Sequence, residues 1–434
     1  MNAFRLLPVI LAFLLLGAHF LRSGQSGLTV ISGLFPLLLF IRRGWIVPTM
    51  QIGLLVGAIL WIDTALEIIA FRRASDQPWI RFVVISGAII ILTASSALLF
   101  RLKSIRERYR AEPSSPAIAS AFILTFTLLS IVQLKVRLPM LLMERFLPGF
   151  GWIEILLLSV YSAWITGKML DPAQTARWRK RIWTVFTIVF FSQLALGLLG
   201  LDRFLMTDTL HLPVPAMILA GPLFRGDGFF MPILFGATVL LVGPAWCSHL
   251  CYIGAWDNLA SDRTRKPRRL PAWTHTTRII ILTVIIVVAI ALRLAGASIT
   301  VATILGAAFG MIGVAIMLIW SRQIGVMTHC TAFCPIGLLA NLLGKLSPFR
   351  LCINDRCTDC GICRLSCRYD ALNMSDIKRR RPGLTCTLCG DCLHSCTDRA
   401  LEYRFFRLYP TTARAVFIVL VVSLHAVCLG LALI

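Results

Sequence analysis

Residues 357–396 read CTDCGICRLSCRYDALNMSDIKRRRPGLTCTLCGDCLHSC, and the spacing C-x2-C-x2-C-x3-C occurs twice within them. The eight cysteines of these two runs are Cys357, Cys360, Cys363, Cys367, Cys386, Cys389, Cys392 and Cys396. In two-cluster ferredoxins the fourth cysteine of each run binds the other cluster. The sequence therefore predicts two [4Fe–4S] clusters, in which Cys396 completes the first set of three cysteines and Cys367 completes the second.

Zinc is the alternative occupant of such cysteines, because zinc ribbons also use C-x2-C pairs. Two complete four-cysteine runs exceed what a tetrahedral zinc site needs. Gly361 and Gly390 stand at the same place in each run, where the chain must turn sharply. Arg368 and Thr397 replace the proline that usually follows the fourth cysteine. This change is expected to add N–H donors near the sulfur atoms and to shift the cluster potential.

The composition is that of a membrane protein, with 58% hydrophobic and 15% charged residues and a mean hydropathy of +0.81. The net charge of +23 would suggest nucleic acid in a soluble chain, but the basic residues cluster in short loops between apolar segments. We therefore expect membrane lipid, and no nucleic acid, as a partner. Of the fourteen cysteines only Cys428 stands alone, which favours metal clusters in a reducing compartment over disulfides.

The apolar stretches predict a mainly α-helical, polytopic bundle of about eleven spans of roughly 20 residues each. They lie near 4–21, 28–41, 46–70, 81–100, 117–134, 150–170, 182–201, 229–246, 279–297, 300–320 and 413–432. The first resembles a signal peptide but lacks small residues at a cleavage site, so we expect it to stay as a helix. The second is short enough for a re-entrant segment.

Lysine and arginine predict the orientation. The loops 101–112, 168–181 and 252–278 are basic, and the last two contain Arg179 and Arg278. If these loops face the cytoplasm of a bacterial inner membrane, the N-terminus is cytoplasmic and the C-terminus periplasmic. The ferredoxin segment lies between the tenth and eleventh spans, and it is then cytoplasmic too.

Four domains are expected from these patterns. Residues 1–112 form an N-terminal four-helix membrane module, followed by a Pro/Ser-rich linker. Residues 117–349 form a membrane core, 350–407 a small α+β bacterial-type ferredoxin insert with two clusters, and 411–434 the last span.

A second group of cysteines lies where spans reach the predicted cytoplasmic face. Each of the two pairs has the spacing C-x3-C, and the residues are Cys247, Cys251, Cys330 and Cys334. This spacing places two thiols one helical turn apart on one face. Four such thiols could hold a third cluster or another metal, or form a redox-active dithiol or disulfide. The alternative is that small cysteines pack where helices meet.

The combination of C-x3-C motifs at helix ends and a following two-cluster ferredoxin resembles membrane polyferredoxins of the NapH/NosR type. YccM-like and CcoG-like proteins share this layout, and the resemblance covers roughly residues 117–410. It implies electron transfer between the quinone pool and another redox protein or subunit, with the eight ferredoxin cysteines as cluster ligands. The chain departs from the family at Tyr252, where a proline is usual, and has no external flavin-binding domain.

The predicted external loop 202–228 is the candidate quinone site. His211 with Asp208 or Asp227 would accept protons, and Arg225 would orient the quinone head group. Interfacial salt bridges and a solvated histidine are the favoured alternative.

The predicted function is membrane electron transfer between the quinone pool and a redox partner, as a candidate quinol dehydrogenase or quinone reductase component. One alternative is a metal-reducing assembly factor of the CcoG type. Another is a membrane anchor subunit of an oxidoreductase complex.

Overall fold

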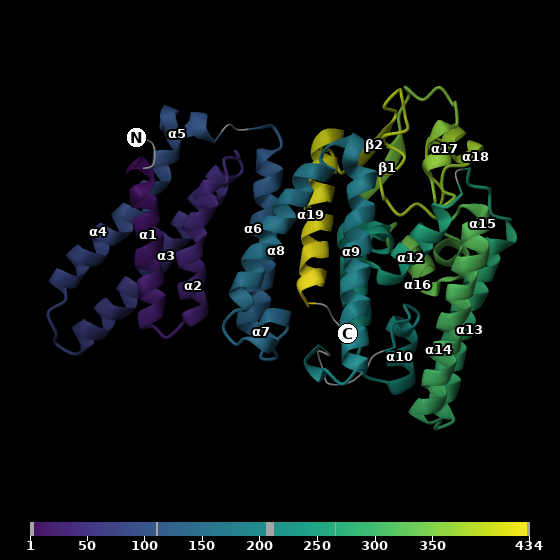
Figure 1. Cartoon of the computed structure of the whole chain (residues 1–434), viewed down its shortest axis with the longest axis horizontal. Helices are drawn as coiled ribbons and strands as arrows, with labels where there is room; N and C mark the ends of the chain where they lie inside the picture. The colour runs from purple at the N-terminus through teal and green to yellow at the C-terminus, as the bar shows by residue number, and fades with distance from the viewer. Residues whose placement is uncertain (1–3, 110–111, 205–211, 265, 432–434) are drawn as a thin grey trace. The chain divides into compact units, whose positions relative to one another are not determined.

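The structure is a computed structural model, and it describes residues 4–109, 112–204, 212–264 and 266–431 (Figure 1). It is mainly helical, as predicted, and forms two compact units, Met1–Thr166 and Gly167–Ile434. This division follows packing alone, so the domain boundaries expected from the sequence stay predictions. All fourteen cysteines belong to the second unit.

The first unit is built of long apolar helices joined by short connections. Its elements are η1 (Phe4–Leu6), α1 (Leu7–Arg22), α2 (Ser26–Leu34), η2 (Phe35–Phe40), α3 (Ile46–Ala74), α4 (Ile80–Ser96), η3 (Ala97–Arg101), α5 (Lys103–Arg108), α6 (Ser115–Lys135), α7 (Leu142–Phe146) and α8 (Gly151–Met169). Helix α1 packs against α2, and α3 against α4. Aromatic rings fill the contact between η2 and α6, where the ring centroids of Phe35 and Phe122 lie 6.2 Å apart.

The second unit combines spans, short helices and one small sheet. Its elements are α9 (Pro172–Leu198), η4 (Asp202–Phe204), α10 (Met217–Arg225), α11 (Phe230–Val242), η5 (Gly243–Ala245), η6 (Trp246–Leu250), α12 (Tyr252–Ser261), α13 (Trp273–Leu294), α14 (Ile299–Ile316), η7 (Met317–Ser321), α15 (Arg322–Ile324), η8 (His329–Phe333), α16 (Pro335–Leu343), β1 (Phe349–Ile353), α17 (Ile362–Ser366), α18 (Met374–Lys378), β2 (Leu401–Phe405) and α19 (Pro410–Leu431). Helix α9 begins at Pro172, and its N-cap Asp171 accepts the N–H of Ala173 at 3.0 Å.

All eleven predicted apolar segments contain helix, and within the described residues eight helices are long and apolar enough to cross a membrane. The first two segments correspond to shorter helices, α1 and α2 with η2, and the sixth to α8, which is not among the eight. In the second unit α19 is half buried, whereas α13 and α14 expose most of their apolar side chains. Such exposure is expected of helices that face lipid.

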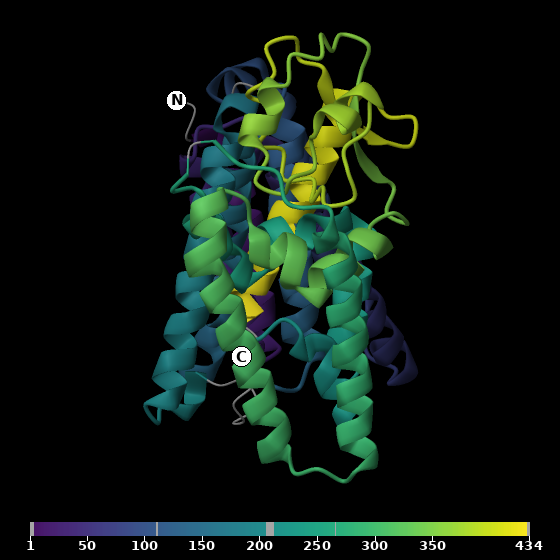
Figure 2. The same cartoon turned by 90° about the vertical axis from the view of Figure 1, so that its right-hand side faces the viewer.

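The cysteine-rich segment is closed by a two-stranded antiparallel sheet. Strands β1 and β2 pair in a register that runs from Phe349 opposite Phe405 to Ile353 opposite Leu401. Between them lie the short helices α17 and α18, the latter held by a capping box between Asn373 and Asp376. In both views this segment lies at one end of α9, α13, α14 and α19, next to α12 and α16 (Figures 1 and 2).

Candidate metal centres

The first predicted cluster set is brought together around one small, largely enclosed cavity. Its lining includes Cys357, Cys360, Cys363 and, from the far end of the segment, Cys396. Burial and the proximity of the other three thiols raise the pKa of Cys363 to about 11. Cys360 is exposed, so this set lies next to solvent. The structure thus gathers the crossed set of four that the spacing predicted, while cluster binding stays a prediction.

The second predicted set is gathered in the same way but lies deeper. Burial raises the pKa of Cys392 well above its usual value, and the neighbouring thiols that add to this are Cys389, Cys367 and Cys386. The two sets repeat one backbone detail. The N–H groups of Ala371 and Ala400 donate to the sulfur atoms of Cys367 and Cys396, each at 3.3 Å.

Each pair of helix-end cysteines is built on one π-helical turn, which the sequence did not predict. In η6 the N–H of Cys251 donates to the carbonyl of Trp246 at 3.0 Å, and in η8 the N–H of Cys334 donates to that of His329 at 2.7 Å. Cys251 and Cys334 are extended and act as N-caps of α12 and α16. Burial raises the pKa of Cys251 to about 12 and that of Cys334 above its usual value, whereas the backbone N–H groups at the start of each following helix act to lower them.

The backbone around these turns is repeated as well. A Cβ atom on Gly254 would lie 2.9 Å from the carbonyl oxygen of Cys247, and one on Gly337 would lie 2.7 Å from that of Cys330. Both glycines thus allow the following helix to approach its π-helical turn. Tyr252, which replaces the usual proline, stacks on Phe190 with a centroid distance of 3.9 Å.

The four helix-end thiols face one another inside the protein. Burial raises the pKa of Cys330 well above its usual value, and Cys251, Cys334 and Cys247 all contribute to the increase. Within the described residues no three Cys, His, Asp or Glu side chains converge closely enough to hold a single metal ion, and this includes the ferredoxin sets. All four cysteines are free thiols, so the structure shows no disulfide among them.

A buried carboxylate lies beside these thiols. One oxygen of Asp257 accepts the backbone N–H of Cys330 at 2.9 Å, and the other has no hydrogen-bond partner among the described residues. Burial raises the pKa of Asp257 to about 6, although hydrogen bonds from Ser321 and Cys330 act to lower it. This acid fixes the position of η8 relative to α12.

The helix-end set and the second ferredoxin set share one buried contact. Tyr369 is 3% exposed and packs in one cluster with Trp183 and Met327, against which Cys330, Cys367 and Cys389 also pack. The phenol oxygen of Tyr369 has no hydrogen-bond partner within the described part of the chain. Cysteines of the two sets thus pack against one small buried cluster.

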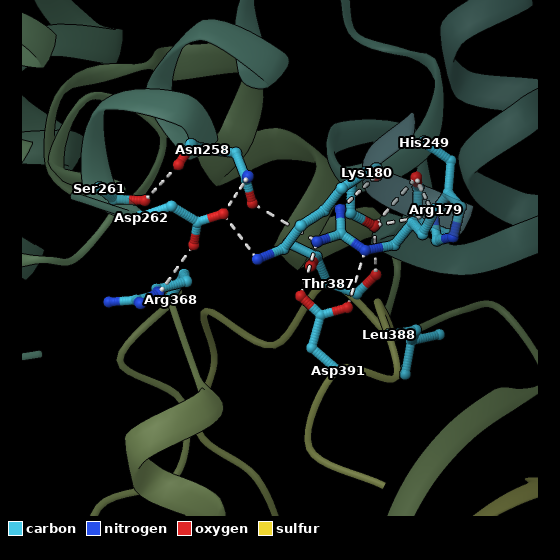
Figure 3. A network of polar contacts seen from close by, with 12 residues as sticks. Arg179, Lys180, His249, Asn258, Ser261, Asp262, Arg368, Thr387, Leu388 and Asp391 are labelled. Carbon is cyan, nitrogen blue, oxygen red and sulfur yellow. Dashed lines mark hydrogen bonds and ion pairs between the residues drawn. The ribbon is translucent and has the colours of Figure 1, made fainter. Parts of the chain in front are cut away.

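A buried ion pair between Arg179 and Asp391 connects the second ferredoxin set to the helices (Figure 3). The Nε and Nη2 atoms of Arg179 donate to the two carboxylate oxygens of Asp391 at 2.8 and 2.6 Å. Its Nη1 atom donates to the carbonyl of Ser248 at 3.0 Å, and Nη2 to the Asn258 side chain at 3.4 Å. The Ser248 hydroxyl in turn donates to the carbonyl of Thr387 at 3.1 Å.

Arg368 also connects the ferredoxin segment to the helices. Its Nε atom lies 3.2 Å from Asp262, which also pairs with Lys180 at 2.6 Å (Figure 3). The Nη1 atom of Arg368 donates to the carbonyls of Thr264 and Gly325, each at 2.8 Å. The replacement of proline by Arg368 therefore docks the ferredoxin segment, a role that the sequence did not indicate. The N–H groups directed at Cys367 belong to Tyr369 and Ala371 instead.

The candidate quinone residues are only partly placed. Asp208 and His211 lie outside the described residues. Arg225 and Asp227 form an ion pair at 3.3 Å, and 43% and 79% of their side chains are exposed. This ion pair matches the salt bridge that the sequence offered as the alternative.

The comparisons with known proteins point to iron and sulfur. Residues 228–271 and 303–353 match a family described as "4Fe-4S binding domain". These segments contain the two C-x3-C motifs and not the ferredoxin runs. The chain is also 24% identical over 217 residues to an uncharacterized protein of Methanocaldococcus jannaschii, covering 44% of this chain and 83% of the relative. No solved structure matches. Together with the long apolar helices, the match and the gathered cysteines indicate an iron–sulfur protein of a membrane.

Proposed function

We propose that this chain is a membrane electron-transfer protein of the NapH/NosR type, which carries electrons between the quinone pool and a redox partner. Two [4Fe–4S] clusters would be held by the ferredoxin cysteines in the crossed arrangement. A third centre would be held by Cys247, Cys251, Cys330 and Cys334. Iron–sulfur clusters supply one-electron redox steps, and the chain's residues hold and insulate them.

The observation that carries this proposal is the buried cluster around Tyr369. Cys330 of the helix-end set and Cys367 and Cys389 of the second ferredoxin set pack against the same buried cluster. In the crossed arrangement the second ferredoxin cluster would adjoin the first through the loops of Cys367 and Cys396. The three centres would then form a series from the helix ends to the surface.

The exposed end of this series is the first ferredoxin set. Cys360 is exposed, and apolar side chains at its edge, Ile362 and Leu365, are 43% and 50% exposed. A soluble or subunit redox partner would exchange electrons there. The quinone would react at the other end of the series, on the side of the helix-end thiols.

The orientation follows from the same scheme. We infer a bacterial inner membrane with the N-terminus and the ferredoxin segment in the cytoplasm, where clusters are assembled. Reporter fusions to either end of the chain test this. Periplasmic activity of a reporter fused at the N-terminus would contradict it.

The test of electron transfer uses the full chain purified without air. Addition of a short-chain quinol should reduce iron–sulfur signals followed by EPR, and iron analysis should give about twelve irons per chain for three cubes. A matched Cys363→Ser variant should lose the signal of the first cluster. It should still be reduced by quinol at the remaining centres.

Two outcomes would contradict the proposal. Iron-free protein would remove the redox role altogether. Iron-loaded protein that neither quinol nor a strong reductant reduces would leave only a membrane anchor.

A further inference from the structure

Arg278, in the second turn of α13, is the starting point. Its side chain is fully buried. The Nε, Nη1 and Nη2 atoms all lack a hydrogen-bond partner, and no ion pair involves this residue within the described ranges. A buried guanidinium without an anion is strongly unfavourable, so native proteins pair such groups.

Arg179 shows what this protein does with a comparable residue. It is also fully buried, yet it binds both oxygens of Asp391 and two further acceptors. Arg278 has the same burial and none of these contacts. The difference points to a negative charge at Arg278 that no Asp or Glu side chain of the described residues supplies.

The surroundings of Arg278 identify this anion by its chemistry. The guanidinium interacts electrostatically with Cys334, Cys247 and Cys330. Its Nη2 atom lies 3.7 Å from the point that a Cβ on Gly337 would occupy, next to the second π-helical turn. Neutral thiols carry no charge and are weak acceptors. Four thiolates around a [4Fe–4S] core carry a net negative charge, and that is the charge Arg278 lacks.

We propose that Arg278 is the charge-compensating residue of an anionic [4Fe–4S] centre held by the four helix-end cysteines, and that it raises the reduction potential of this centre. The inference rests on the third centre of the proposed function. Reduction adds one electron and one negative charge, and the electron comes from quinol and leaves to the second ferredoxin cluster. Arg278 stays protonated throughout and stabilises the reduced form by its fixed positive charge.

The test compares Arg278→Gln, Arg278→Lys and Arg293→Gln in the full chain. Arg293 lies near the other end of α13 and serves as the matched control. EPR-monitored redox titration of anaerobic protein should show a lower reduction potential for the third centre in Arg278→Gln. The expected decrease is at least about 59 mV, which is a tenfold decrease in the equilibrium constant of this one-electron reduction. Arg278→Lys should retain most of the wild-type potential, and Arg293→Gln all of it. The two ferredoxin clusters serve as internal references.

Arg278→Met covers the case in which the glutamine variant does not fold, because an apolar side chain of similar length fills the same space. Loss of about four irons in the Gln and Met variants, with retention in Arg278→Lys, also supports the inference. An unchanged potential in a folded variant that keeps its third centre would overturn it and leave the proposed function standing. Wild-type protein with about eight irons would overturn both the inference and the third centre. Electron transfer through the ferredoxin clusters would then remain.

Discussion

At the scale of single residues, two buried side chains connect the ferredoxin segment to the helices. Arg179 supplies charge and hydrogen bonds to Asp391, and Tyr369 supplies apolar contact. The chemistry of each residue determines how its replacement will act. An unpaired charge in a protein interior is expensive, whereas a phenol oxygen that lacks a partner can be removed at little cost.

Asp391→Asn should weaken docking of the second ferredoxin set. The change leaves the buried Arg179 without its counter-charge, at a cost of about 3–5 kcal/mol. Limited proteolysis of the ferredoxin segment and the iron content of the second cluster measure the effect. Arg404→Gln is the matched control, because Arg404 pairs with Glu402 with 58% of its side chain exposed. Such pairs contribute about 0–1 kcal/mol, and equal effects of the two substitutions would refute the assignment.

Tyr369→Phe should preserve both stability and electron transfer, because the removed hydroxyl makes no hydrogen bond within the described residues. Tyr369→Ala should cost about 3–5 kcal/mol through the cavity it leaves. It should also slow electron exchange between the helix-end centre and the second cluster. Freeze-quench EPR after mixing with quinol measures the rate. A large loss in the Phe variant would show that the hydroxyl, and not the packing of the ring, matters.

At the scale of elements, the helix-end cysteine site is built from one structural unit that occurs twice. Each copy consists of a π-helical turn, a cysteine that acts as N-cap, and a short helix. The second cysteine leaves the turn in an extended conformation, so its thiol lies over the N-terminus of the next helix. Gly254 and Gly337 allow the close approach that this geometry needs.

Gly337→Ala should move α16 away from the π-helical turn η8, because the added methyl would lie 2.7 Å from the carbonyl oxygen of Cys330. We expect loss of about four irons, with both ferredoxin clusters retained. Gly236→Ala in α11 is the control, since nothing lies within 4 Å of its added methyl. Helical alanine is favoured over glycine by about 1 kcal/mol, so the control should fold as well as wild type. Iron analysis and EPR distinguish the two, and full iron in Gly337→Ala would contradict the role of this glycine.

The elements also show how far sequence reasoning reached. Hydropathy predicted the helical segments, and cysteine spacing predicted which thiols the structure gathers, because both signals are local. From the sequence, Arg179 and Arg278 are basic loop residues that orient the chain, yet in the structure both lie in helices and are fully buried. Arg179 pairs with Asp391, which is distant in sequence, and Arg278 lies near cysteines of other segments, so no local pattern marks either residue. Likewise, nothing in the spacing C-x3-C distinguishes a π-helical turn from an ordinary helical turn.

At the scale of the whole molecule, the cysteine sets form a gradient of exposure. Cys360 of the first set is exposed, whereas Cys392 of the second set is 6% exposed and lies next to the buried Asp391. The four helix-end cysteines are buried or nearly so. Access of water and solutes should therefore fall from the first ferredoxin set toward the helices.

This gradient predicts the order in which iron is lost. A membrane-impermeant chelator added with a mild oxidant should remove the first ferredoxin cluster fastest, because solvent reaches Cys360 directly. The second cluster should follow, and the helix-end centre should persist longest. EPR signals recorded over time in detergent-solubilised protein give the order, and Asp391→Asn should accelerate loss of the second cluster without changing the first. Simultaneous loss of all signals would mean that the ferredoxin segment opens as one unit, and the gradient of exposure would then not govern access to the clusters.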